Sequence, residues 1–269
     1  MLKTEMRNPK TTHIDTADTL TMLELINAEN YNAVRAVENA MPQIAQAVDI
    51  IADAIAKGGK LIYVGAGTSG RLAVADAAEC PPTFGVSRDV VSAIIAGGEK
   101  TLVSASENQE DFPDQGRADL LAKGIAPGDV VCGISASGGA AYVAGALECA
   151  KEQGCKTISV SSNPNSRIGA LADVEVVTDT GAEVIQGSTR MKAGTAQKLV
   201  LNMFSTCAMI KTGKVYENVM INLKPSNTKL RQRVINIVCS LTGMDEAKAI
   251  EELDKHNWVI RDVLNAQNQ

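Results

Sequence analysis

Short apolar runs alternate with longer amphipathic stretches through the middle of the chain, after the paired glycines Gly58 and Gly59. Each run is bounded by Gly, Ser or Asn and is followed by a stretch with helical periodicity. Runs that are apolar on both faces and alternate with helices are typical of a parallel sheet covered on both sides. The pattern predicts an α/β fold, a doubly wound parallel sheet of about five strands in a three-layer αβα arrangement. The predicted strands are 61–64, 91–96, 130–134, 157–160 and 174–177.

Helices are predicted on both sides of this region of the sequence. Apolar residues recur every three or four positions from Thr19 to Lys57, which indicates amphipathic helices broken near Asn30 and Pro42. The polar segment through Asp15 has no periodic apolar face, so we expect an extended arm, suited to packing on a partner subunit. Further helices are predicted at 191–212 and 224–241, with two short ones within 245–265.

These patterns divide the chain into three expected parts. Residues 1–58 form an N-terminal arm and helices that pack on the core, 59–222 form the α/β domain, and 223–269 form a small C-terminal helical tail. Hydrophobic residues make up 45% of the chain and charged residues 21%, which is close to average globular usage. The composition therefore agrees with one principal core.

Charge and cysteine usage limit the binding partners and the cellular compartment that we expect. A formal net charge of −5 argues against nucleic acid or an anionic membrane as a partner, because both attract clustered Lys and Arg. No apolar run is long enough to span a membrane. The two histidines, His13 and His256, have no ligand-like companions, so no metal site is expected. The six cysteines show no C-x-x-C pair and are read as reduced core thiols of a cytoplasmic protein.

The clearest candidate for ligand binding is the string GAGTSGR, Gly65 to Arg71, between a predicted strand and a helix. In an open parallel sheet, ligands bind beyond the carboxyl ends of the strands, where a helix N-terminus offers free N–H groups to an anion. We therefore expect a phosphate at Gly67, Thr68 and Ser69.

The same string satisfies G-x-G-x-x-G, so a dinucleotide is an alternative ligand. Against it, Glu99 lies about thirty residues further on rather than the roughly twenty expected of the ribose-binding acid. Other predicted strands also end in hydroxyl-rich loops, with Ser135 and Ser137 after one and Ser161 and Ser162 after the next. Several such loops favour a phosphosugar with many hydroxyl groups, although tight turns alone would explain the glycines.

Acidic residues and a second motif complete the candidates. Glu79 precedes Cys80 and two prolines that are expected to end the helix, and Glu110 follows Glu107 by about one helical turn. From pattern alone each is more often a solvated charge. The string GSTRMKAGTAQK, 187–198, either caps the long helix after it or brings Ser188 and Lys192 to a ligand.

Taken together, the strings resemble the N-acetylmuramic acid 6-phosphate etherases, a family of the sugar isomerase (SIS) fold group. The resemblance covers most of the chain, and the long string GSTRMKAGTAQK is its most specific part. The other matching strings are RNP, GAGTSGRL, ECPPTFGV, IAGGE, GAEV and TGKV.

The resemblance implies cleavage of the D-lactyl ether of N-acetylmuramic acid 6-phosphate by β-elimination and hydration, in amino-sugar and peptidoglycan recycling, without a metal or other cofactor. It implies a homodimer with Glu79 and Glu110 as the catalytic acid and base. Which glutamate takes which role is open; Glu79 is expected to protonate the departing lactate oxygen and Glu110 to act at C2. The resemblance implies substrate contacts by Thr68, Ser69 and Ser137, and also by Ser188 and Lys192. Gly67, Glu107 and Ser135 are expected as further substrate-binding residues.

The chain departs from the family pattern ASGRTPYV at residues 135–143, where it reads SASGGAAYV. The Arg, Thr and Pro are absent, so a cationic contact near the sugar is expected to be missing. Two other functions remain open for the same fold: a non-catalytic sugar-phosphate-binding regulator, and an aldose–ketose phosphosugar isomerase. The presence of both Glu79 and Glu110 favours an enzyme over the regulator.

Overall fold

The computed structural model describes residues 2–104, 108–223, 225 and 227–267. Contacts divide the chain into two compact units: Met1–Ala78 with Asp89–Ala208 (unit 1), and Glu79–Arg88 with Met209–Gln269 (unit 2). The three-part division expected from the sequence stays a prediction.

Unit 1 is built on a five-stranded parallel sheet with the order β2-β1-β3-β4-β5. Each predicted apolar run forms one strand, so the predicted α/β fold and its strands are confirmed. The central strands β1 and β3 are buried along their whole length, which explains why they read as continuous apolar runs. The strands are β1 (Leu61–Gly65), β2 (Val91–Ile95), β3 (Val130–Ile134), β4 (Lys156–Ser161) and β5 (Val174–Val177).

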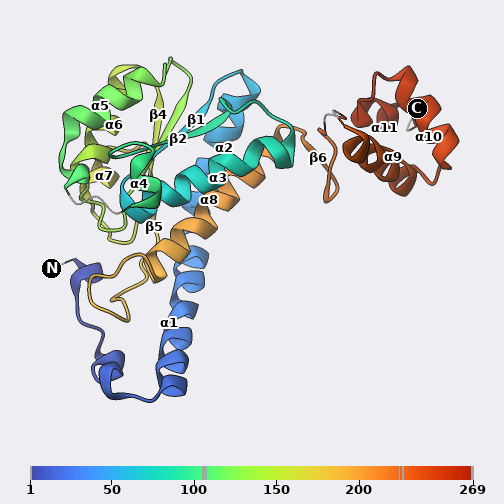
Figure 1. Cartoon of the computed structure of the whole chain (residues 1–269). Helices are drawn as coiled ribbons and strands as arrows, with labels where there is room; N and C mark the ends of the chain where they lie inside the picture. The colour runs from blue at the N-terminus through green and yellow to red at the C-terminus, as the bar shows by residue number, and fades with distance from the viewer. Residues whose placement is uncertain (1, 105–107, 224, 226, 268–269) are drawn as a thin grey trace. The chain divides into compact units, whose positions relative to one another are not determined.

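Helices cover both faces of the sheet (Figure 1). Ile62 and Val64 of β1 point to one face and pack in a cluster with Leu147. Tyr63 points to the other face, where its hydroxyl donates to Asp76. The helices of unit 1 are α1 (Thr19–Asn39), α2 (Met41–Ala56), α3 (Gly67–Phe84), α4 (Lys100–Val103), α5 (Pro113–Ala122), α6 (Ala141–Glu152), α7 (Arg167–Ala170) and α8 (Lys192–Lys211), of which α3 and α8 continue into unit 2.

Asp76 is a buried carboxylate that ties α3 to both β1 and α8. Its oxygens accept hydrogen bonds from the Tyr63 hydroxyl at 3.1 Å, from Asn202 Nδ2 at 2.7 Å and from Ser205 Oγ at 3.1 Å. Burial raises the pKa of Asp76, although these hydrogen bonds act in the opposite direction. The contacts fix α3 against the strand from which its N-terminal loop emerges.

The N-terminal helices differ from the prediction at one point. Helix α1 runs without interruption through Asn30, where a break was expected, because a single Asn in a helix costs only roughly 0.7 kcal/mol relative to Ala. The break near Pro42 is confirmed, since α1 ends at Asn39 and α2 begins at Met41 with the proline in its first turn.

The N-terminal arm is not extended, contrary to expectation. It forms three 3₁₀ turns, η1 (Lys3–Glu5), η2 (Pro9–Thr11) and η3 (Ile14–Thr16), and lies along the loop that precedes α8 (Figure 1). Thr4, Asn8 and Thr11 are buried there and hydrogen-bonded; Thr11 Oγ1, for example, donates to the Val184 carbonyl at 2.8 Å. Polar burial of this kind leaves no apolar periodicity in the sequence.

Helix α3 also continues further than expected. It includes Pro81 and Pro82 and ends only at Phe84. Proline lacks the N–H of a helical residue, but its fixed φ matches the helical value, so the backbone follows the helix for a last turn. Gly85, with φ of +65°, then ends it.

Unit 2 has a small apolar core of its own, in which Val234, Val238, Leu253 and Val263 are buried. The predicted tail helices are confirmed, with small shifts in their ends. The elements of unit 2 are the hairpin strands β6 (Val215–Tyr216) and β7 (Val219–Met220) and the helices α9 (Thr228–Thr242), α10 (Glu246–Lys255) and α11 (Ile260–Gln267).

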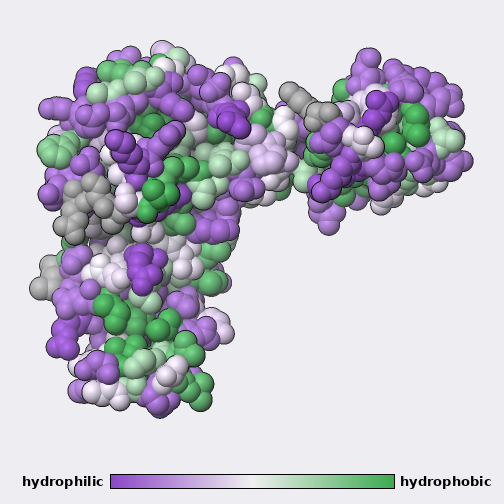
Figure 2. Space-filling model, viewed as in Figure 1, coloured by the Kyte–Doolittle hydropathy of each residue, from purple (hydrophilic) through white to green (hydrophobic). Residues whose placement is uncertain are grey.

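An apolar patch is exposed on the surface of unit 1. Figure 2 shows hydrophobic residues gathered over the N-terminal segment and the start of α1. On α1 the side chains of Leu20, Leu23, Tyr31 and Val34 are all more than half exposed, and their spacing places them on one helix face. Among the helices of the described residues, none has the length and apolar character needed to cross a membrane.

Candidate active site

The loop after β1 places the N-terminus of α3 at the carboxyl edge of the sheet. Gly65 and Gly70 touch across this turn, since a Cβ on Gly65 would lie 2.7 Å from the Gly70 nitrogen. Gly67 has φ of +52° and opens the helix. The glycines therefore allow a tight turn that points the first N–H groups of α3 outward, where they attract an anion.

A pocket of about 290 Å³ lies at this loop. It combines the loops after β1 and β3 with a residue of the 3₁₀ turn η4 (Gln109–Asp111), and the N-terminal arm and the loop before α8 also contribute. Among the described residues that line it there is no Lys, Arg or His. The pocket is lined by Glu5, Ala66, Gly67, Thr68, Ser69, Glu110, Ile134, Ser135, Ala136, Ser137, Ala140, Gly187 and Thr189.

A larger cavity, of about 1010 Å³, lies beside the edge strand β2. It is bordered by apolar residues such as Ile94, Leu102 and Phe112. None of the described residues predicted to bind substrate lines it, and it does not include the loop after β1. We therefore take the smaller, hydroxyl-rich pocket as the candidate active site.

The serines after β3 are held in place by their own loop. Ser135 Oγ accepts a hydrogen bond from the Gly138 N–H at 3.1 Å, and Ser137 Oγ accepts one from the Gly139 N–H at the same distance. The two hydroxyl oxygens also lie 3.4 Å from each other, so when one donates to the other, the second keeps its hydrogen for a ligand. The backbone N–H groups of Gly138 and Gly139 thus orient Ser135 and Ser137.

Ser69 makes a buried contact with α8. Its Oγ lies 2.9 Å from Oε1 of Gln197, and both side chains are buried. Gln197 Nε2 has no hydrogen-bond partner among the described residues. Turning the amide over would let Nε2 donate to Ser69 and would free the serine hydrogen for a phosphate oxygen.

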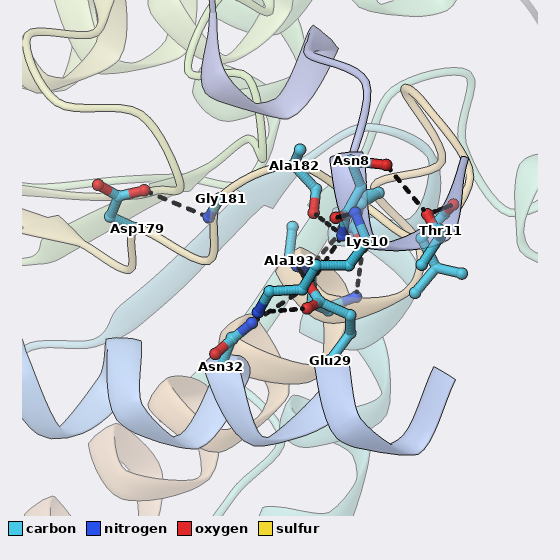
Figure 3. A network of polar contacts seen from close by, with 12 residues as sticks. Asn8, Lys10, Thr11, Glu29, Asn32, Asp179, Gly181, Ala182 and Ala193 are labelled. Carbon is cyan, nitrogen blue, oxygen red and sulfur yellow. Dashed lines mark hydrogen bonds and ion pairs between the residues drawn. The ribbon is translucent and has the colours of Figure 1, made fainter. Parts of the chain in front are cut away.

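Lys192 is 1% exposed and forms an ion pair with Glu29 of α1, with 2.5 Å between Nζ and Oε2. Figure 3 shows the surroundings of this carboxylate, toward which Asn8 and Lys10 of the arm extend. Burial alone would raise the pKa of Glu29, but the hydrogen bond and charge of Lys192 and the hydrogen bonds of Lys10 and Asn8 hold this pKa below its usual range. The Lys192 ammonium is thus paired with a carboxylate of the chain itself.

The start of α8 is fixed by a second buried carboxylate. Glu183 is fully buried and accepts hydrogen bonds from the backbone N–H groups of Lys192 and Ala193, at 3.1 and 3.0 Å. A carboxylate at this place satisfies free N–H groups and balances the positive end of the helix dipole. The capping role that the sequence left open for 187–198 is therefore filled by Glu183.

The structure thus brings Gly67, Thr68, Ser69, Ser135, Ser137 and Glu110 around one pocket. Ser188 and Lys192 do not line it, although their neighbours Gly187 and Thr189 do. Glu79 is exposed on α3, about three turns after Gly67, and belongs to unit 2, whereas every lining residue belongs to unit 1. Glu107 lies outside the described residues.

Three lining residues that lie outside the loops after β1 and β3 were not predicted. Gly187 and Thr189 lie inside the string GSTRMKAGTAQK, so closer attention to that motif could have found them. Glu5 has no such signal, because it belongs to a polar segment without periodicity. Among the described residues, no three His, Cys, Asp or Glu side chains are grouped to hold a metal ion.

Two family models match parts of the chain. The glucokinase regulatory protein N-terminal SIS domain matches residues 43–151, and the SIS domain matches residues 98–206. Together they include the loops after β1 and β3 and most of the residues that line the pocket.

Curated relatives match nearly the whole chain. The N-acetylmuramic acid 6-phosphate etherase 1 of Bacillus licheniformis is 50% identical over 95% of this chain and 84% of its own length. The N-acetylmuramic acid 6-phosphate etherase of Pasteurella multocida is 50% identical over 95% of this chain and 85% of its own.

Solved structures share the fold at lower identity. A phosphoheptose isomerase from Francisella tularensis has a TM-score of 0.53 at 20% identity, covering 70% of this chain and 97% of its own. A phosphoheptose isomerase from Neisseria gonorrhoeae has a TM-score of 0.50 at 22% identity, covering 70% of this chain and 98% of its own. The fold is therefore that of the SIS proteins.

Proposed function

The chain belongs to the N-acetylmuramic acid 6-phosphate etherase family, and from this membership we propose that it cleaves the D-lactyl ether of N-acetylmuramic acid 6-phosphate. The products are N-acetylglucosamine 6-phosphate and D-lactate, and the setting is peptidoglycan recycling. The observation that supports this most strongly is identity of 50% along 95% of the chain.

The reaction proceeds by elimination and hydration. In the open-chain sugar, the C1 aldehyde acidifies the proton at C2, and a base removes it. The C3–oxygen bond breaks, a C2–C3 double bond forms, and lactate leaves with a proton from a general acid. Water then adds across the double bond, with its oxygen at C3, and gives N-acetylglucosamine 6-phosphate.

The lining of the pocket supports two parts of this reaction, the binding of the phosphate and the base at C2. The N-terminus of α3 and the hydroxyls of Thr68, Ser69 and Ser137 would bind the phosphate through uncharged donors, in keeping with the absence of a cation from the described lining. Glu110 opens onto the same pocket and is exposed, so it can reach a bound sugar as the base at C2.

The general acid and the remaining substrate contacts are proposed from the sequence and the resemblance alone. Glu79 is proposed as the acid that protonates the lactate oxygen, and Glu107, Ser188 and Lys192 as further substrate contacts. Because the Lys192 ammonium is paired with Glu29, we expect its contribution to be indirect, through the position of the loop 187–189.

We further propose that the protein is a homodimer and that a second copy covers the apolar face of α1. Leu20 and Leu23 are 65% and 59% exposed, which favours burial in a partner. Sedimentation of the wild type is expected to give twice the chain mass of 28.3 kDa, and Leu23→Glu to lower it toward the monomer. A wild type that sediments as a monomer would exclude the dimer.

The six cysteines, all within the described part of the chain, are free thiols, and this supports a cytoplasmic location, where thiols stay reduced. Four of them, Cys80, Cys132, Cys149 and Cys155, are buried.

The decisive experiment is incubation with N-acetylmuramic acid 6-phosphate and enzymatic assay of D-lactate. We expect release of D-lactate in equal amount to N-acetylglucosamine 6-phosphate. Binding of the sugar phosphate without lactate would contradict the etherase activity and favour a non-catalytic regulator, a function to which the match over 43–151 also relates. Interconversion of an aldose and a ketose phosphate would favour an isomerase.

A further inference from the structure

The N-terminal turn η1 forms one wall of the active-site pocket, and Glu5 is the residue of the turn that lines it. The Glu5 carboxylate lies over Gly187, where a Cβ would be only 3.3 Å from Oε2. Glycine at 187 therefore leaves room for this carboxylate. Glu5 and Glu110 are the ionisable residues of the described lining.

Specific hydrogen bonds hold the turn in this position. The Lys3 N–H donates to Asn163 Oδ1 at 2.8 Å, and Asn163 Nδ2 donates to Thr4 Oγ1 at 3.0 Å. Gln186 Nε2 donates to the Glu5 carbonyl at 2.9 Å. Thr4 and Asn163 are 1% and 2% exposed, so the turn is docked through buried polar contacts whose loss would be costly.

Asn163 links this turn to the substrate loop after β3. The same Nδ2 that donates to Thr4 also lies 3.2 Å from the Ala136 carbonyl and 3.3 Å from the Ser137 carbonyl. Ala136 and Ser137 line the pocket. One buried amide therefore sets the position of Glu5 relative to the serine loop.

We propose that Glu5 is a substrate-contacting residue that accepts hydrogen bonds from the hydroxyl groups of the bound sugar and so determines specificity for a phosphosugar over phosphate alone. An ionised carboxylate only accepts hydrogen bonds, and it repels a phosphate. With no cation in the described lining, the phosphate binds at the α3 end and Glu5 receives the polyol part. This inference rests on the proposed function only for the choice of sugar.

The test compares two ligands on the same variants. Calorimetric titration with N-acetylglucosamine 6-phosphate and with inorganic phosphate would use wild type and Glu5→Ala, carrying any tag at the C-terminus. We expect Glu5→Ala to weaken the sugar phosphate about 10- to 100-fold, the range for hydrogen bonds to a charged group. Inorganic phosphate is expected to bind as well as before or more tightly, because a negative charge has been removed.

Glu5→Gln keeps the size and one acceptor oxygen, so a loss of about three- to tenfold is expected. It also serves if Glu5→Ala does not fold. Glu148→Ala, at an exposed site on α6 that does not line the pocket, is the matched control and should change neither affinity. In turnover, Glu5→Ala should raise KM with little change in kcat, as for a contact made equally in ground and transition states.

Equal weakening of both ligands would overturn the proposal, because it would mean that the turn only supports the serine loop. So would a change of less than about twofold in the affinity for the sugar phosphate, or no binding of that ligand by the wild type. Absence of D-lactate from the wild type, with the two-ligand pattern intact, would overturn the etherase activity and leave the role of Glu5 standing.

Discussion

Replacing Glu110 with Gln is expected to lower kcat by about 10²–10⁴-fold while the protein still binds the sugar phosphate. Gln has the size and hydrogen-bonding reach of Glu but cannot take a proton, so the variant loses the base and keeps the shape of the pocket. Glu110 lines the same pocket as Thr68 and Ser69 and is exposed to it. Steady-state D-lactate release, with calorimetry of N-acetylglucosamine 6-phosphate, measures the two effects separately.

Asp111→Asn is the matched control, because Asp111 is an exposed acid of the same turn η4 that does not line the pocket. Its turnover should stay within a factor of about two of the wild type, since a substitution away from the reacting atoms removes no proton transfer. Near-normal turnover by Glu110→Gln would show that another group removes the C2 proton. A loss of binding equal to the loss of turnover would instead make Glu110 a binding residue.

The expected splits of kcat and KM for Glu110 and Glu5 are opposite, and this separates their roles. A group that acts only in the transition state changes kcat, whereas a group that holds the sugar throughout changes KM. Both are carboxylates in one pocket, so their chemistry alone does not distinguish them. They belong to different turns of unit 1, Glu110 to η4 and Glu5 to η1, and the kinetic split assigns a role to each.

The sheet could be predicted because burial on both faces leaves a strong record in sequence. Strands β1 and β3 contain almost only apolar residues, and the glycines and hydroxyl residues after them indicate where the chain turns toward a ligand. Ser69 and Ser137 were found by that rule, and both line the pocket. The residues proposed to bind the phosphate can therefore be predicted from local pattern.

The other side of the pocket could not be predicted in this way. Glu5 reaches it because Lys3 and Thr4 are joined by polar hydrogen bonds to Asn163, which lies 160 residues after Lys3. Polar contacts of this kind have no periodicity, and an isolated Thr-Glu pair near a chain end reads as solvated. For the same reason the ion pair of Lys192 with Glu29, which lies on a distant helix, could not be predicted.

The buried ion pair of Glu29 and Lys192 is expected to contribute strongly to the stability of unit 1. Replacing Glu29 with Gln would leave the Lys192 ammonium, 1% exposed, without its opposite charge, and should lower the free energy of unfolding by about 3–5 kcal/mol. Urea unfolding followed by far-ultraviolet circular dichroism measures the loss. Lys10→Ala, which removes the 71%-exposed partner of the same carboxylate, should cost at most about 1 kcal/mol.

The stabilisation from the Glu29–Lys192 pair should depend on pH. The folded state holds the pKa of Glu29 below its value in the unfolded chain, so as pH falls the unfolded chain takes up the proton first. The stabilisation from Glu29 is therefore complete above the unfolded pKa of roughly 4.3 and is lost as pH falls through the folded pKa. Glu29→Gln should remove this part of the acid sensitivity.

A double variant, Glu29→Gln with Lys192→Met, should recover much of the stability that Glu29→Gln loses, because it removes the unpaired charge. If stability does not recover, the hydrogen bonds from Asn8 and Asn32, rather than the charge, explain the role of Glu29.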